Sequence, residues 1–126
     1  NTKDGKKYIT VPVTNTKGNI SDVLIAKEYQ RQMQKNIATI ENTYKKCPFW
    51  KQFGEDFLER YSTPFTNLED YNISLMKWVF NHLDININIV KANDLNATGA
   101  KGDLLLDLLH KVNADKYIDV KSGKDY

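Results

Sequence analysis

The chain has 126 residues, of which 40% are hydrophobic and 27% charged, with a formal net charge of +2. This composition is typical of a globular domain that is long enough to bury a core, and so small a charge gives no reason to expect a nucleic-acid partner. The single cysteine excludes an internal disulfide, and no apolar run reaches the roughly 18 residues of a membrane helix. We therefore expect no membrane span and a reducing compartment.

The first predicted element is an N-terminal pair of strands that form a hairpin. Hydrophobic side chains alternate along residues 7–14. Because proline donates no ladder hydrogen bond, Pro12 predicts that this strand lies at an edge or carries a bulge. Residues 15–19 have the composition of a turn, and residues 20–25 are the second strand.

Two amphipathic helices follow, and the turn between them is the feature around which the chain is organised. Aromatic and aliphatic side chains recur at helical spacing along residues 26–44 and again along residues 48–61. Pro48 suits the first turn of the second helix, where no backbone N–H is needed. Gly54 weakens that helix by roughly 1 kcal/mol relative to alanine.

A third helix is predicted to begin near a capping box formed by Thr66 and Glu69. Its apolar stripe runs from Leu68 to Leu83, and Met76 and Phe80 widen it. This width predicts a helix that is buried on more than one side.

The last part of the chain has the pattern of a crossover between parallel strands. Isoleucines alternate with asparagines over residues 85–89, a leucine-rich helix follows over residues 104–112, and residues 116–120 are a short strand. The sequence therefore predicts an α/β fold, with a small, mostly parallel sheet covered by a layer of three long helices. Because strand-like sequence lies close to both ends, we interpret residues 1–126 as a single domain and as an internal part of a longer protein.

The residues that most often carry chemistry give few candidates. His82 and His110 are the only histidines, and their spacing does not supply a set of metal ligands, so we expect no metal site. Cys47 could act as a nucleophile, but at a helix–helix turn a cysteine is more often a small packing residue.

One loop suggests an anion site. Residues 99–103 place two glycines and Lys101 before a helix, where backbone amides favour a negative charge. The loop has neither of the established phosphate-binding patterns, so a plain loop with a helix cap is the competing interpretation. Residues 122–125 lie just beyond the last predicted strand, at the edge where α/β sheets place ligands.

Several stretches, taken together, carry a family resemblance. They are Ile9-Thr10-Val11-Pro12-Val13, Ile40 with Tyr44, Pro48-Phe49-Trp50, Leu68 with Asp70, Ala114-Asp115-Lys116-Tyr117, and Gly123-Lys124-Asp125-Tyr126. In order and spacing, these stretches resemble the WbqC-like family of bacterial proteins along essentially the whole chain. Each motif alone has low specificity, and their collinearity supports the resemblance.

The resemblance implies a cytoplasmic protein encoded among genes for surface polysaccharides such as O-antigen. It also implies a group transferase, moving an aminoacyl or glycyl group onto a sugar, with a sugar or nucleotide sugar as substrate. The family's histidine-proline segment is not in this chain. Asp119-Val120 stands where the family has a Ser-Gly pair, and Asn36 stands where many members have a histidine.

Two functional hypotheses follow. In the first, a transferase binds an anion or sugar at a rim of residues near the ends of the last strands: Lys101, Asp119, Lys121, Lys124, Asp125 and Tyr126. Its catalytic residues, cofactor and oligomeric state are not assigned. In the second, the chain is a non-catalytic assembly or binding module that uses the aromatic helical face around Phe49, Trp50 and Trp78.

Overall fold

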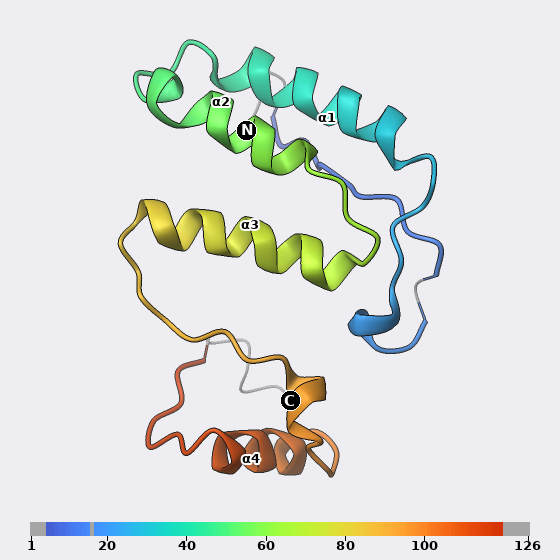
Figure 1. The fold of residues 1–126 in the computed structure, drawn as a ribbon, viewed down its shortest axis with the longest axis vertical. Coiled ribbons are helices and arrows are strands. Elements are labelled where there is room, and N and C mark those ends of the chain that lie inside the picture. The colour runs from blue at the N-terminus through green and yellow to red at the C-terminus, as the bar shows by residue number, and fades with distance from the viewer. Residues whose placement is uncertain (1–4, 16, 120–126) are drawn as a thin grey trace. The chain divides into compact units, whose positions relative to one another are not determined.

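The computed structural model describes residues 5–15 and 17–119. The helices of this described part are α1 (Tyr29–Tyr44), α2 (Trp50–Ser62), α3 (Leu68–His82) and α4 (Gly102–Lys111), with short 3-10 helices η1 (Ile20–Asp22) and η2 (Ala92–Leu95) (Figure 1). The chain divides into two compact units, residues 1–86 and residues 87–126. The interpretation of the whole chain as a single domain and as part of a longer protein stays a prediction.

The predicted α/β fold is wrong. The structure is 54% helical, and the strand pairing among its described residues consists of two isolated antiparallel bridges, Val13–Ile25 and Leu24–Asn67, with no sheet. Of the predicted N-terminal hairpin, only local pairing is present, in which the Thr14 amide donates to the Leu24 carbonyl at 2.9 Å. Residues 20–22 form η1 instead of a strand.

The two later strands of the predicted crossover are also missing from the described residues. Ile85 and Ile87 lie in a run without regular structure and are 41% and 53% exposed. Residues 116–119 form no strand, and Val120 lies outside the described residues. Alternation indicates an extended segment with one apolar face, but a strand also needs a neighbour to satisfy its backbone, and none is present here.

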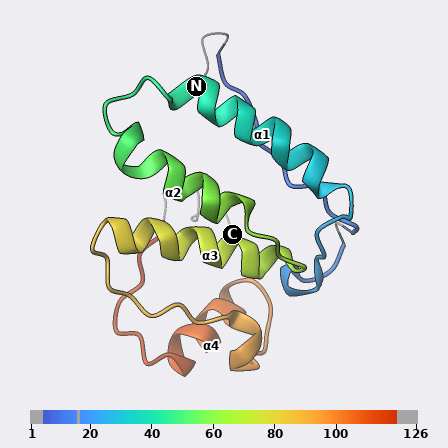
Figure 2. The same ribbon diagram turned by 45° about the horizontal axis from the view of Figure 1, so that its top comes forward.

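The predicted long helices are confirmed, with shifted ends. Successive helices α1, α2 and α3 run antiparallel, and α2 lies between the other two in both ribbon views (Figures 1 and 2). The cap of α3 is Asn67 rather than Thr66, because the Asn67 side chain accepts from the amides of Glu69 and Asp70 at 2.7 and 3.3 Å. The predicted broad burial of α3 is wrong at Met76, which is 44% exposed.

The core of the first unit is built around hydrogen-bonded tyrosines. Tyr71 on α3 is only 1% exposed, and its hydroxyl donates to the carbonyl of Tyr61 at 2.8 Å. The hydroxyl of Tyr29 donates in turn to the Tyr71 hydroxyl at 2.8 Å. Tyr61 stands in the last turn of α2, where backbone carbonyls lack helical partners, so Tyr71 satisfies one of them. This network ties the three helices together.

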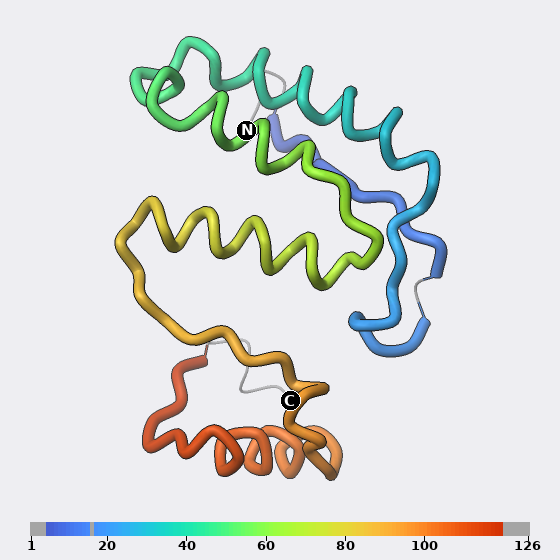
Figure 3. Tube along the Cα trace, viewed as in Figure 1, coloured from blue at the N-terminus to red at the C-terminus, as the bar shows by residue number. Residues whose placement is uncertain are grey.

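Asn36 extends the network to the N-terminal segment. Its side-chain amide, buried on α1, donates to the Tyr61 hydroxyl at 2.7 Å and to the Thr10 carbonyl at 3.0 Å. The tube in Figure 3 shows this segment, in dark blue, running past α1 and α2. Asn36, whose position suggested a departure from a family histidine, therefore has a structural role here.

The second unit has no buried residue among residues 87–119. The predicted last helix is confirmed as α4, which begins two residues earlier than expected. The Asp107 carboxylate accepts from the Thr98 amide at 2.7 Å and fixes the loop that precedes α4. This backbone hydrogen bond lowers the pKa of the Asp107 carboxyl.

We expect Tyr71→Phe to destabilise the protein by about 2 kcal/mol, because it leaves the buried Tyr29 hydroxyl without its acceptor and the Tyr61 carbonyl without its donor. Urea unfolding monitored by circular dichroism measures this loss. Tyr8→Phe is the control, since Tyr8 is 88% exposed, and it should change stability by less than about 0.5 kcal/mol. Equal losses in the two variants would contradict the role given to the network.

Alkaline pH should also destabilise the first unit. Burial raises the pKa of the Tyr29, Tyr61 and Tyr71 hydroxyls, so these groups stay neutral in the folded protein after unfolded tyrosines begin to ionise near pH ~10. Their contribution to stability is fully present below that pH and is lost above it.

The measurement is the free energy of unfolding from about pH 8 to about pH 11. In Tyr29→Phe the free energy of unfolding should fall less steeply with pH, because one group with a raised pKa is removed. The exposed control Tyr8→Phe should leave the fall unchanged. A fall of the same size in Tyr29→Phe and in the unmodified chain would contradict the assignment.

Candidate functional site

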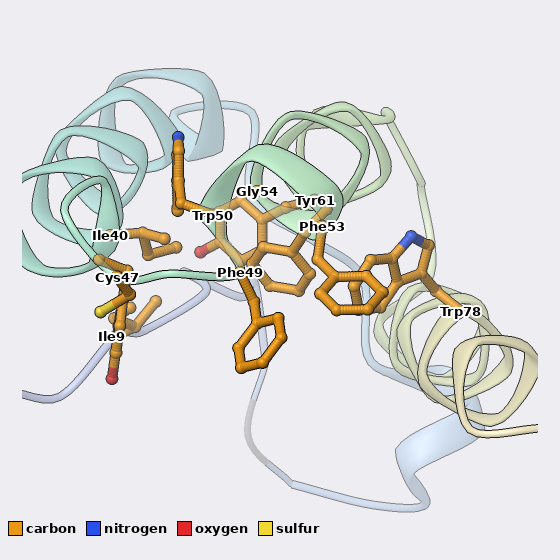
Figure 4. Close-up of a pocket in the computed structure, with 11 residues that line it drawn as sticks. Ile9, Ile40, Cys47, Phe49, Trp50, Phe53, Gly54, Tyr61 and Trp78 are labelled. Atoms are coloured by element: carbon orange, nitrogen blue, oxygen red, sulfur yellow. The ribbon is translucent and has the colours of Figure 1, made fainter.

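An aromatic groove in the first unit is the candidate site. It has a volume of about 410 Å³ and lies beside the turn between α1 and α2 (Figure 4). All of its lining residues belong to the first unit: Ile9, Ile40, Tyr44, Cys47, Phe49, Trp50, Phe53, Gly54, Phe57, Tyr61 and Trp78. The volume lies within the range of roughly 300–1,000 Å³ that is usual for small-molecule sites.

The groove follows from the sequence of the α1–α2 turn. Residues 45–49 leave α1 and lead into α2, so aromatic side chains on both sides of the turn come close together. Figure 4 shows the rings of Phe49 and Phe53 projecting from this part of the chain, with the Trp78 indole of α3 beside Phe53. Trp50 and Trp78 are the only tryptophans of the chain, and both line the groove.

Gly54 lines the groove and leaves room for the Trp50 indole. It is buried one helical turn after Trp50, and a Cβ atom built on it would lie 2.4 Å from Cδ2 of the Trp50 indole. The absence of a side chain therefore lets the indole lie directly on the helix. Sequence reasoning counted this glycine only as a weak point of α2, whereas the structure gives it a packing role.

A polar cluster adjoins the groove through Trp78. The indole Nε1 of Trp78 donates to Oδ2 of Asp56 at 2.6 Å, and Nε2 of His82 lies 3.2 Å from the same oxygen. The His82 ring lies against the Trp78 indole, with centroids 4.1 Å apart and planes tilted by 33°, and forms a T-shaped pair with Phe53 at 5.5 Å. The cluster fixes the orientation of Trp78 and keeps a carboxylate at the edge of the groove.

The hydrogen bonds of His82 limit its chemistry. Nδ1 lies 2.8 Å from the Trp78 carbonyl, and Nε2 faces Asp56, so both ring nitrogens are engaged. A histidine acting as a general base needs a free nitrogen directed at the substrate. His82 therefore serves to position Asp56 and Trp78.

Only two residues of the predicted ligand rim lie in the described part of the chain. Lys101 is the exposed N-cap residue of α4 and has a positive φ of 51°. Asp119 is exposed and interacts with the side chain of Tyr117. The other members of the rim lie outside the described residues: Lys121, Lys124, Asp125 and Tyr126. The rim stays a prediction.

The other two candidate residues, Cys47 and His110, are both exposed. Cys47 is exposed and lines the groove. His110 is exposed on α4. Within the described part of the chain, no three histidine, cysteine or acidic side chains gather in a way that could hold a metal ion.

The comparison with family models decides the family of the chain. The model described as the WbqC-like protein family matches residues 1–126. The chain belongs to this family. No curated protein and no solved structure matches this WbqC-like chain. None of its described helices has the length and apolar character needed to cross a membrane.

The sequence analysis assigned Phe49, Trp50 and Trp78 to a partner-binding face and placed the ligand site elsewhere, at the rim that includes Lys101. The aromatic spacing around Phe49 and Trp50 indicated this part of the groove before any coordinates. Asp56 was missed because helical spacing assigns it to the polar side of α2. The four-residue interval between Trp78 and His82 was an available signal, since such residues share one face of a helix.

Gly54→Ala should lower stability despite the better helix propensity of alanine. The propensity gain is about 1 kcal/mol, but the new Cβ would displace the Trp50 indole, and overpacking of this kind costs roughly 1–3 kcal/mol. Urea unfolding measures the net effect, and tryptophan fluorescence reports the displaced ring. The matched control is Gly102→Ala in the first turn of α4, where nothing lies within 4 Å of the added atom. A Gly54→Ala protein with unchanged fluorescence and higher stability would contradict this packing.

Proposed function

We propose that this WbqC-like chain takes part in surface-polysaccharide biosynthesis as a group transferase, and that the aromatic groove binds its substrate. The transfer reaction, of an aminoacyl or glycyl group onto a sugar, is proposed from the family. The observation that carries the choice of site is the groove itself, a concave aromatic surface with a carboxylate at its edge.

The lining of the groove suits a substrate with an apolar surface. Aromatic rings offer a large contact area at a small cost in conformational entropy, and Trp50 and Trp78 are held in place by Gly54 and Asp56 respectively. Such rigid rings lose little freedom when a ligand packs on them, which favours binding.

Asp56 supplies the polar contact. Its Oδ2 atom is already engaged by Trp78 and His82, while Oδ1 has no hydrogen bond among the described residues. A carboxylate oxygen of this kind can accept a hydrogen bond from a sugar hydroxyl or an amine. The arrangement thus supports a ligand that has an apolar portion in the groove and a hydroxyl-bearing portion at its edge.

A second function is favoured by one observation. Phe49 is 67% exposed, although it belongs to the aromatic surface, and a large exposed ring of this kind is frequent where proteins bind partners. In this alternative, the same surface is an assembly site and the chain is non-catalytic.

Titration of the protein with nucleotide sugars and aminoacyl donors tests the proposal. Both tryptophans line the groove, so their fluorescence reports binding there, and a ligand at ten times its Kd should stabilise the fold by about 1.4 kcal/mol in a thermal-shift assay. Phe49→Ala should weaken binding about fivefold to tenfold through the loss of one ring contact.

The control is Tyr8→Ala, which removes an aromatic side chain that is 88% exposed and does not line the groove. It should bind as the unmodified protein does. Absence of any fluorescence change or stabilisation at millimolar concentrations would contradict the transferase proposal, and concentration-dependent self-association lost in Phe49→Ala would support the assembly function instead.

A further inference from the structure

We propose that the ligand of the aromatic groove is an amphipathic phosphate, with a hydrocarbon portion in the groove and a phosphate held by Lys45 and Lys46 at the α1–α2 turn. The inference rests on the proposed function in one respect, since it takes the groove to be the binding site. It adds the chemical class of the ligand and the residues that recognise its charge.

The interior of the groove favours hydrocarbon over a polyhydroxylated group. Half of its ten lining side chains have no polar atom at all, and each of the others carries a single one. The polar atoms that do lie there are partly engaged, because the Tyr61 hydroxyl already accepts from Asn36 and Trp78 Nε1 already donates to Asp56. A ligand group with many hydroxyls would lose its hydrogen bonds to water and gain few from the groove, which disfavours its burial. The buried portion of the ligand is therefore apolar.

Basic residues gather at the turn between α1 and α2, in a stretch that is flanked by Glu41 and Glu55. Residues 42–54 contain Lys45, Lys46 and Lys51 and no acidic residue, and the same stretch supplies six of the eleven groove residues. All three lysines are exposed, and none makes an ion pair within the described part of the chain. The ammonium groups are thus free to meet a charge on the ligand.

The two sides of the groove differ in charge. Figure 4 places Cys47, which follows Lys46 directly, on the opposite side of the groove from Trp78. The carboxylate of Asp56 is bonded to Trp78, so the acidic group lies on the Trp78 side, whereas Lys46 adjoins Cys47 in the chain. A ligand with one anionic group is consequently oriented, with its phosphate toward Lys45 and Lys46.

Phosphate is the anion that fits this arrangement best. Two flexible ammonium groups next to each other act as point charges and do not need the planar geometry that carboxylates offer to arginine. A phosphate monoester carries more charge than a carboxylate at neutral pH. Because the lysines are exposed, they should increase the affinity for the phosphate only modestly, and added salt should reduce this increase.

The experiment is a tryptophan fluorescence titration of the full chain with decyl phosphate, decanol, inorganic phosphate and uridine monophosphate, each below its aggregation limit. We expect decyl phosphate to bind at least fivefold more tightly than decanol, and the difference to shrink as salt is raised. In the double variant Lys45→Gln/Lys46→Gln this preference should fall below twofold, with decanol binding unchanged. The control Lys27→Gln/Lys35→Gln removes the same charge from exposed positions outside the groove and should keep the preference.

Each other outcome overturns a distinct part of the inference. Equal binding of decanol and decyl phosphate would exclude recognition of charge and leave the groove as a site. Inorganic phosphate binding as tightly as decyl phosphate would exclude a role for the hydrocarbon. Tighter binding of uridine monophosphate would show that the apolar portion is a base.

Failure of the proposed function would look different. If none of these probes, and no nucleotide sugar or aminoacyl donor, altered the fluorescence, both the groove as a binding site and its ligand class would be wrong. A response to nucleotide sugars alone would overturn the amphipathic phosphate and retain the groove.

Discussion

The burial of Tyr71 is the constraint on which the first unit depends. A tyrosine hydroxyl removed from water must find partners, and this one donates to α2 and accepts from α1. Amphipathic helices with wide apolar stripes can pack in more than one register. The paired hydroxyls of Tyr29 and Tyr71, together with the carbonyl of Tyr61, select one register because any slip along a helix would leave a buried group unpaired.

The same constraint shapes the groove. Tyr71 meets Tyr61 with ring centroids 6.0 Å apart, Tyr61 meets Phe57 at 5.9 Å, and Phe57 meets Trp78 at 5.2 Å. A continuous row of rings thus runs from the buried core to the polar cluster at the groove edge. The position of Trp78 is set from one end by this packing and from the other by Asp56 and His82. The groove is therefore a preformed surface, which lowers the entropic cost of binding a ligand.

Membership of the WbqC-like family and the geometry of the groove bear on function at different levels. The family is the source of the transferase proposal. The groove is the source of the proposed ligand class, because its lining is mainly aromatic and aliphatic. The role of one residue is interpreted differently from the family pattern and from the structure. Asn36 suggested a lost catalytic histidine when set against the family pattern, yet in this fold it holds the N-terminal segment to the helices.

The sequence by itself determined the long helices, because helical spacing of rings is a local property and each helix satisfies its own backbone hydrogen bonds. It also indicated the aromatic turn around Phe49 and Trp50. Only the tertiary structure decided the strands and the second half of the site. Alternating isoleucines at residues 85–89 cannot form a sheet unless a distant segment supplies the partner, and no spacing rule places Asp56 of α2 against Trp78 of α3. Contacts between separate elements depend on how helices are packed, and that packing was decided here by which buried hydroxyls could be satisfied together.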